Sequence, residues 1–93
     1  MIILVQHTVR DFDAWKPVFD EHAMVRKQHG ATGHALYRSM DDPNDVLVAN
    51  FFPSRGQAEA FASDPTLGVM MQRGGVIGEP RITWADEVET VKY

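Results

Sequence analysis

Cysteine is absent from this chain of 93 residues. The absence excludes disulfide bonds, and it also excludes zinc sites built on thiolate ligands. A chain of this length forms one small domain, residues 1–93, and buries only about 60 to 65% of the surface that its unfolded form exposes. Such domains often need a further source of stability, so we expect association with a second copy of the chain to supply it.

Basic residues and long apolar runs are also scarce. Lys and Arg number 9 against 13 Asp and Glu, a net charge of −4, and they lie scattered along the chain. This argues against a nucleic-acid partner. No apolar run approaches the roughly 20 residues that cross a membrane. The opening MIILVQHTV is too short for a signal peptide and has no basic leader, so we expect a cytoplasmic protein with no membrane partner.

Motifs for cofactors, metals and nucleophiles are missing as well. RGGVIG follows a predicted helix rather than a strand, unlike a phosphate-binding loop. Nothing marks a flavin or nicotinamide site, and no Ser-His-Asp arrangement is recognisable, so we expect no cofactor. His22 and His29 would lie about 10.5 Å apart along one helix, too far for a single ion. No carboxylate-rich motif accompanies His7 and His22, so we also expect no metal.

One helix face combines apolar and cationic residues. The members of this stripe are spaced 4, 3, 4 and 3 and fall within an arc of roughly 80°: Trp15, Phe19, His22, Arg26 and His29. The pattern predicts a short first turn near residues 12–15, then a helix to about Gln28 with Pro17 near its start and Gly30 as its stop. Polar groups are costly to bury, so they either have partners or line a cavity.

The rest of the chain alternates between strand and helix patterns. Strands are expected at 2–10, 31–40, 46–53 and 81–91, with a turn at 41–45 and a loop at 73–80. A serine-capped helix is expected at 54–65. A second short helix follows Asp64, with Leu67, Met70 and Met71 on its apolar side.

This β-α-β-β-α-β order predicts an α+β, ferredoxin-like fold, with a four-stranded antiparallel sheet and helices on one face. The other face would expose a patch of apolar side chains: Ile2 and Leu4 or their alternates on the first strand, with Leu36, Leu47 and Phe51. A second copy that covers this patch would remove it from water, so we predict a homodimer through the helix-free face of the sheet.

The segments HTVRDFDAWKPVFDEH, YRSMDDPNDVLV and DPTLGVMMQRGGVIGEPRITWADEVE resemble a known family. They are similar to the small dimeric α+β-barrel proteins that are grouped with antibiotic-biosynthesis monooxygenases and are often labelled cyclase-like. The resemblance covers nearly the whole chain. It implies two ferredoxin-like protomers packed sheet against sheet, each with a pocket between sheet and helices. The fold hosts cofactor-free oxygenases, haem-degrading enzymes, chlorite dismutases, lactone isomerases and stress proteins of unknown activity.

His22 and Arg26 are the candidate catalytic residues. In a pocket, His22 would accept a proton and Arg26 would anchor an anionic oxygen of the substrate. The alternative is structural: Arg26 extends to the helix edge or pairs with a carboxylate, and His22 bonds to backbone. Trp15 and Phe19, on the same stripe, are candidates for contact with a small aromatic ligand.

Further candidates lie on the strands. His7 and Asn50 fall in mid-sheet, where they either orient a ligand or satisfy each other through a buried hydrogen bond. Tyr37 and Trp84 either belong to the core or stack on a flat aromatic substrate. Haem-degrading relatives use an Asn, a Trp and a His around the porphyrin. Asn50, Trp84 and His22 are of these types, although their spacing does not match that motif.

Two functions from different classes follow from these observations. The first is a cofactor-independent monooxygenase that acts on a phenolic or polycyclic compound. The second is a non-catalytic or stress-related barrel that binds a small ligand or none. A cavity of several hundred Å³ lined by His22, Arg26 and aromatic side chains favours the enzyme. A closed core favours the second function.

Overall fold

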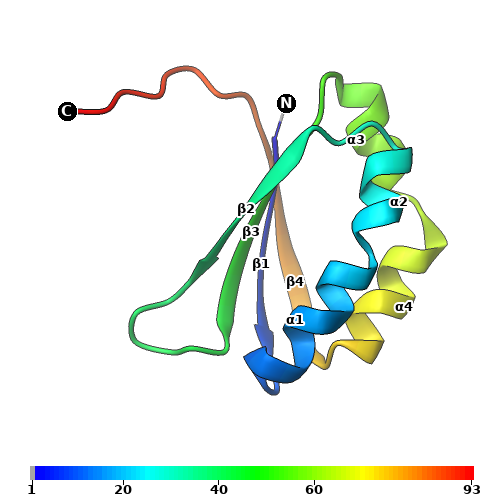
Figure 1. Cartoon of the computed structure of the whole chain (residues 1–93), viewed down its shortest axis with the longest axis vertical. Coiled ribbons are helices and arrows are strands. Elements are labelled where there is room, and N and C mark those ends of the chain that lie inside the picture. The colour runs from blue at the N-terminus through cyan, green and yellow to red at the C-terminus, as the bar shows by residue number, and fades with distance from the viewer. Residues whose placement is uncertain (1) are drawn as a thin grey trace.

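A four-stranded antiparallel sheet forms one layer of the molecule, and the helices form the other (Figure 1). The structure is a computed structural model and describes residues 2–93. Its elements are β1 (Ile2–Val9), α1 (Phe12–Glu21), α2 (Ala23–Gln28), β2 (Gly33–Arg38), β3 (Asp45–Phe51), α3 (Arg55–Ala62), α4 (Pro65–Arg73) and β4 (Val76–Ala85). The strand order is β2-β3-β1-β4, which confirms the predicted α+β, ferredoxin-like arrangement.

Side chains alternate along the central strands and so define a helix-facing side. On β1 the buried residues are Ile3, Val5, His7 and Val9. Ile3, Val5 and Val9 join two clusters of buried side chains beneath the helices. One cluster centres on Phe52 and Phe61, and the other on Trp15 and Phe19. The core therefore lies between the sheet and the helical layer, on one face only.

The first helical region differs from its prediction. Pro17 lies inside α1 rather than in its first turn, and the helix breaks at His22 instead. Asp11 caps α1 by accepting from the backbone N–H of Asp13. Pro17 is the sixth residue of α1. It has no backbone N–H, so it removes one intrahelical hydrogen bond, but the helix continues to Glu21. The break at His22 separates α1 from α2 and changes the direction in which the following side chains point.

The last strand also differs from its prediction. Residues 73–80 were expected to form a loop, but β4 begins at Val76, and it ends at Ala85 rather than at residue 91. Gly78 has a φ of 72°, and the pairing of β4 with β1 shifts register between Gln6 and Thr8. This irregularity lets an edge strand accommodate the glycine and Pro80, which read as loop residues in the sequence. Residues 86–93 leave the sheet as an extended tail (Figure 1).

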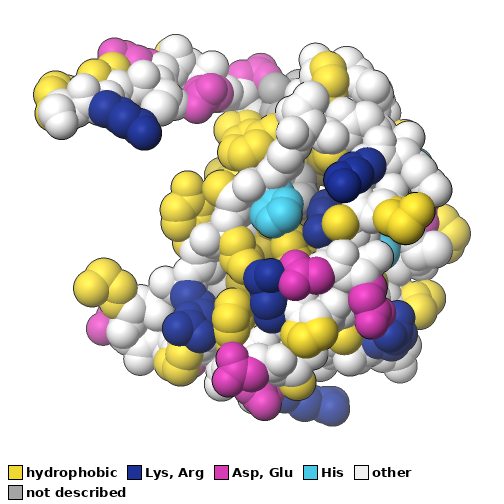
Figure 2. Space-filling view, in the orientation of Figure 1, with side chains coloured by type: hydrophobic (Ala, Val, Ile, Leu, Met, Phe, Trp, Pro, Cys, Tyr) yellow, Lys and Arg dark blue, Asp and Glu magenta, His cyan; other side chains and the backbone are white. Residues whose placement is uncertain are grey.

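The face of the sheet opposite the helices carries much of the predicted apolar patch. Leu4 and Leu47 lie on this face of β1 and β3, flanking Gln6. Hydrophobic side chains line the side of the sheet away from the helices (Figure 2). The placement of Leu36 on this face was wrong: it lies opposite the buried Val48 and packs against the core cluster on the helix-facing side.

Candidate functional site

A small cavity lies between the sheet and all four helices, and we call it the inner cavity. Its volume is about 30 Å³, which is room for one or two water molecules. This falls far short of the several hundred Å³ that a ready-made pocket for a polycyclic compound would need. The lining side chains are mostly apolar, with four polar ones among them: Ile3, Val5, His7, Trp15, Phe19, Arg26, Val48, Asn50, Phe61, Ala62, Leu67, Met70, Met71 and Ile82.

Arg26 reaches the inner cavity from α2. Its side chain is buried, with only 4% of it exposed. Nη1 donates a 3.0 Å hydrogen bond to the carbonyl oxygen of Phe19, and the guanidinium carbon lies 3.9 Å from the centre of the Phe19 ring. The second terminal nitrogen, Nη2, is buried without a partner, and no ion pair to Arg26 forms within residues 2–93. Burial lowers the pKa of this guanidinium, and the charge of Asp20 offsets part of that effect.

His7 and Trp15 form one end of the inner cavity. Their rings meet edge to face with centroids 5.5 Å apart. Both ring nitrogens of His7 and the indole N–H of Trp15 are buried without partners among the described residues. Burial lowers the pKa of His7, and the charge of Asp45 offsets part of that effect. His7 is therefore a neutral imidazole at neutral pH, with one nitrogen able to accept a proton.

Asn50 and Arg26 line the other end of the inner cavity. Asn50 lies opposite Ile3 on β1 and opposite His34 on β2, and its side-chain oxygen is buried without a partner in residues 2–93. His34 packs edge to face on Phe19 at 5.1 Å. Burial lowers the pKa of His34, and the nearby charge of Arg26 lowers it further. Ile3 and His7 are four positions apart, so the backbone at the two polar ends is separated by about 13 Å along β1.

The unpartnered atoms identify this cavity as a candidate binding site. Sequence alone left open whether His7 and Asn50 satisfy each other, and the structure shows that they do not. Buried polar atoms normally have partners, and each one without a partner costs roughly 1 to 3 kcal/mol. Five such atoms in one apolar cavity favour a ligand that offers an acceptor at one end and a titratable group at the other.

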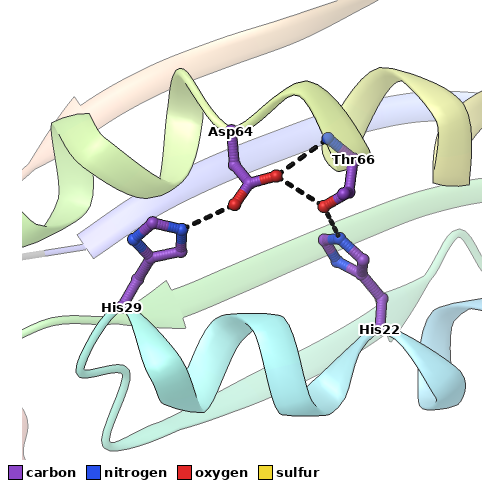
Figure 3. Close-up of polar contacts among 4 residues, drawn as sticks. All are labelled: His22, His29, Asp64 and Thr66. Atoms are coloured by element: carbon purple, nitrogen blue, oxygen red, sulfur yellow. Dashed lines mark hydrogen bonds and ion pairs between the residues drawn. The ribbon is translucent and has the colours of Figure 1, made fainter.

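His22 belongs to a different group of side chains. Its Nε2 lies 3.0 Å from the hydroxyl oxygen of Thr66, which donates in turn to Asp64 at 2.6 Å (Figure 3). His29 joins the same carboxylate through Nε2 at 2.8 Å. This chain of contacts ties α2 to the start of α4. His22 is buried, and its ring lies 6.0 Å from that of Phe61, but it contacts α4 and does not line the inner cavity with Arg26.

A second, larger hollow opens between α1 and α4, and we call it the outer hollow. Its volume is about 320 Å³. Seven residues from these two helices and the break between α1 and α2 line it: Val18, Glu21, His22, Thr66, Val69, Met70 and Arg73. Arg73 Nη2 and Glu21 Oε2 form a 3.1 Å ion pair there. Burial is the main cause of a lowered pKa at His22, with the charge of Arg26 second.

Two other predicted ligand contacts lie away from the inner cavity. Tyr37 pairs with Leu47 on the helix-free face and is 58% exposed. Trp84 lies opposite Ile3 at the end of β4, is 38% exposed and does not line the cavity. His34 lies opposite Asn50 but is exposed and does not line the inner cavity; its position depends on strand register, which spacing within one strand does not reveal.

Neither a metal site nor a membrane span is visible in the part of the chain that the structure describes. No three His, Asp or Glu side chains of residues 2–93 are grouped as a metal ion would require. None of the helices in that range is long and apolar enough to cross a membrane.

Comparisons with known proteins identify relatives by structure only. No family model matches the chain, and no curated protein matches it by sequence. A Bordetella bronchiseptica protein with the provisional name antibiotic biosynthesis monooxygenase superposes with a TM-score of 0.78 at 12% identity, over 95% of this chain and 96% of that one. A Caulobacter crescentus protein of the same provisional name gives 0.75 at 18% identity, over 95% and 89%.

A third relative by structure has a stated activity. SnoaB from Streptomyces nogalater, described as a cofactor-independent oxygenase, superposes with a TM-score of 0.72 at 15% identity, over 94% of this chain and 93% of that one. Coverage near the full length of both chains means that the likeness extends over nearly the whole fold. The chain therefore has the ferredoxin-like fold of the antibiotic biosynthesis monooxygenase-like proteins.

Proposed function

We propose that this protein is a small-molecule enzyme, a cofactor-independent oxygenase that acts on a phenolic or polycyclic compound in the inner cavity. The observation that carries the proposal is the set of unpartnered polar atoms on His7, Trp15, Arg26 and Asn50, all within one apolar cavity. The fold shared with the cofactor-independent oxygenase SnoaB supports the same reaction class.

Arg26 and His7, at the two polar ends of the inner cavity, have different roles in the proposed reaction. Arg26 holds an oxygen that becomes negatively charged, with Nη2 as the free donor. His7 takes a proton from the opposite side of the ring system, as a neutral imidazole can. This assignment replaces His22, whose Nε2 is engaged with Thr66 outside the cavity. A fused-ring compound that spans the roughly 13 Å between the two ends, hydrogen-bond lengths included, needs the inner cavity to open beyond its volume of about 30 Å³.

The reaction balances without a cofactor. Removal of a proton from a CH₂ group conjugated to a ring carbonyl leaves an electron-rich anion. That anion donates electrons to dioxygen, one oxygen atom bonds to the carbon, and the other leaves as water. The CH₂ group thereby becomes a carbonyl group, and the substrate is the sole reductant.

A second candidate function follows from the size of the inner cavity. At about 30 Å³ it resembles a closed core more than an open pocket. This favours a non-catalytic or stress-related protein that binds a small ligand. The two functions differ in one measurement: the enzyme consumes dioxygen when it binds its ligand, and the binding protein does not.

The test uses Arg26→Lys and a dihydroxyanthrone as the probe. Lysine keeps the charge but loses the planar pair of donors, so the charge-assisted bond is lost. We expect binding to weaken by about 1.5 to 3 kcal/mol, which is roughly ten- to a hundred-fold in affinity, with little change in the melting temperature. His7→Gln should retain binding and abolish dioxygen uptake, measured with an oxygen electrode.

Arg55→Lys is the matched control, because Arg55 is an exposed arginine in a surface ion pair with Glu59, away from both the inner cavity and the outer hollow. It should leave both affinity and oxygen uptake unchanged. Binding without oxygen uptake by the unmodified protein would establish the second candidate function. Normal binding by Arg26→Lys together with a lowered melting temperature would make Arg26 a structural residue.

We also propose that the protein is a homodimer through the helix-free face of the sheet. Leu4, Leu47 and Tyr37 leave apolar surface on that face, with Leu47 37% and Tyr37 58% exposed. A second copy placed sheet against sheet would cover this surface, as the resemblance to dimeric α+β barrels implies.

A further inference from the structure

Met70 is the only residue that lines both the inner cavity and the outer hollow among residues 2–93. Each of the other lining residues of α4 lines only one of the two spaces, according to the face of the helix on which it lies. Leu67 and Met71 face the inner cavity, and Thr66, Val69 and Arg73 face the outer hollow. The Met70 side chain therefore stands at the boundary between the two spaces.

The α1 helix shows the same division on the opposite side of the boundary. Trp15 and Phe19 line the inner cavity, whereas Val18 and Glu21 line the outer hollow. Met70 is 8% exposed, so it fills the seam between the two helices. Methionine is unbranched and has three rotatable side-chain bonds, so it can swing aside at little cost.

We infer that the outer hollow is the entrance to the inner cavity and that Met70 is the gate between them. This inference rests on the proposed function for its ligand, a fused-ring phenolic compound. With Met70 rotated toward solvent, the 30 Å³ cavity opens into the 320 Å³ hollow. The joined space reaches the volume that small-molecule sites have.

The polar residues of the outer hollow fit an entrance. His22 and Thr66 offer hydrogen-bonding groups on one side, and the Glu21–Arg73 ion pair crosses from α1 to α4. That ion pair is exposed, with side chains 59% and 63% accessible, so it opens at little cost. The contacts of Asp64 with His29 and Thr66 fix the start of α4, so that the gate moves by side-chain rotation and the helix stays in place.

The test measures access of acrylamide to Trp15, which is fully buried against the inner cavity. The chain has two tryptophans, so Trp84→Phe serves as the background in which Trp15 alone emits. In that background, Met70→Ala should raise the acrylamide quenching constant of Trp15 several-fold. Met70→Leu, which is similar in volume but branched, should lower the association rate of the dihydroxyanthrone.

Two alanine variants serve as matched controls. Met71→Ala removes the same side chain from the inner cavity only, and Val69→Ala enlarges the outer hollow only. Both should leave Trp15 shielded. Two results would contradict the proposal that Met70 is the gate. One is equal quenching of Trp15 in Met70→Ala and Met71→Ala. The other is no increase in quenching in Met70→Ala when circular dichroism shows that the fold is intact. Acrylamide quenching needs no oxygenase activity, so failure of the proposed function and failure of the gate give different results.

Discussion

Close packing at some single positions of this protein leaves no room for a larger side chain. Gly74 ends α4 beside the fully buried Trp15. A Cβ atom at this position would lie 2.7 Å from Trp15 Cδ1 and 3.2 Å from the carbonyl oxygen of Met70. Neither neighbour can yield easily, because one is a ring in the core and the other is backbone. The absence of a side chain at Gly74 therefore lets α4 approach the inner cavity closely.

We predict that Gly74→Ala lowers the free energy of unfolding by about 1 to 3 kcal/mol, the usual cost of overpacking. Gly68, in the interior of the same helix, has open space where its Cβ would lie. Gly68→Ala should instead raise stability by roughly 0.5 to 1 kcal/mol, because alanine favours the helix. Urea denaturation of the two variants measures both effects. Equal stability of the two would contradict the packing argument.

The helices carry charge interactions that act at the level of whole elements. Asp64 caps α4 through the backbone N–H of Thr66 and also binds His29 beyond the end of α2. Hydrogen bonds from His29, then from the hydroxyl and backbone N–H of Thr66, lower the pKa of Asp64 from 3.8 to about 2. The folded state therefore holds the ionised carboxylate more tightly than the unfolded chain does. This contribution to stability is complete above pH 3.8 and is lost as the pH falls toward 2.

We predict that Asp64→Asn flattens this acid dependence. Asparagine keeps an oxygen to accept from Thr66 but carries no charge for His29. The difference in unfolding free energy between the native protein and the variant should shrink as the pH falls from 3.8 to about 2. Thermal unfolding across that range measures it. Asp20→Asn removes an exposed pair with Lys16 as the control, and an equal effect there would refute the prediction.

The strands and helices also show which features of the fold could be predicted from the sequence. Periodicity predicted the order of strands and helices, because alternation and a 3.6-residue repeat reflect burial on one face. It failed at β4, where Gly78 and Pro80 signalled a loop although edge strands tolerate both residues. It also predicted one continuous helix to about Gln28, whereas the structure divides that helix at His22. Arg26 still reached the inner cavity, whereas His22 did not.

At the scale of the whole molecule, the remaining prediction concerns the proposed homodimer. Leu47 lies centrally on the helix-free face, beside Gln6 on β1 and Tyr37 on β2. Leu47→Glu places a charge in the proposed interface, so we expect it to convert the dimer to a monomer with lowered stability. Met24→Glu is the control, because Met24 is 69% exposed on α2 in the helical layer. Sedimentation at micromolar concentration distinguishes the two states. A native protein that sediments as a monomer would contradict the proposal.

The strand order has a consequence for how the chain folds. The central strand β1 pairs with β4, joining Ile2 to Ala85, whereas β2 and β3 form a local hairpin. Closing so long a loop costs more conformational entropy than closing a hairpin, so contacts distant in sequence form late. We expect the β2–β3 hairpin to form early and β4 to dock last. The strand that completes the sheet thus sets the folding rate, and the irregular pairing near Gly78 lies in the slowest step.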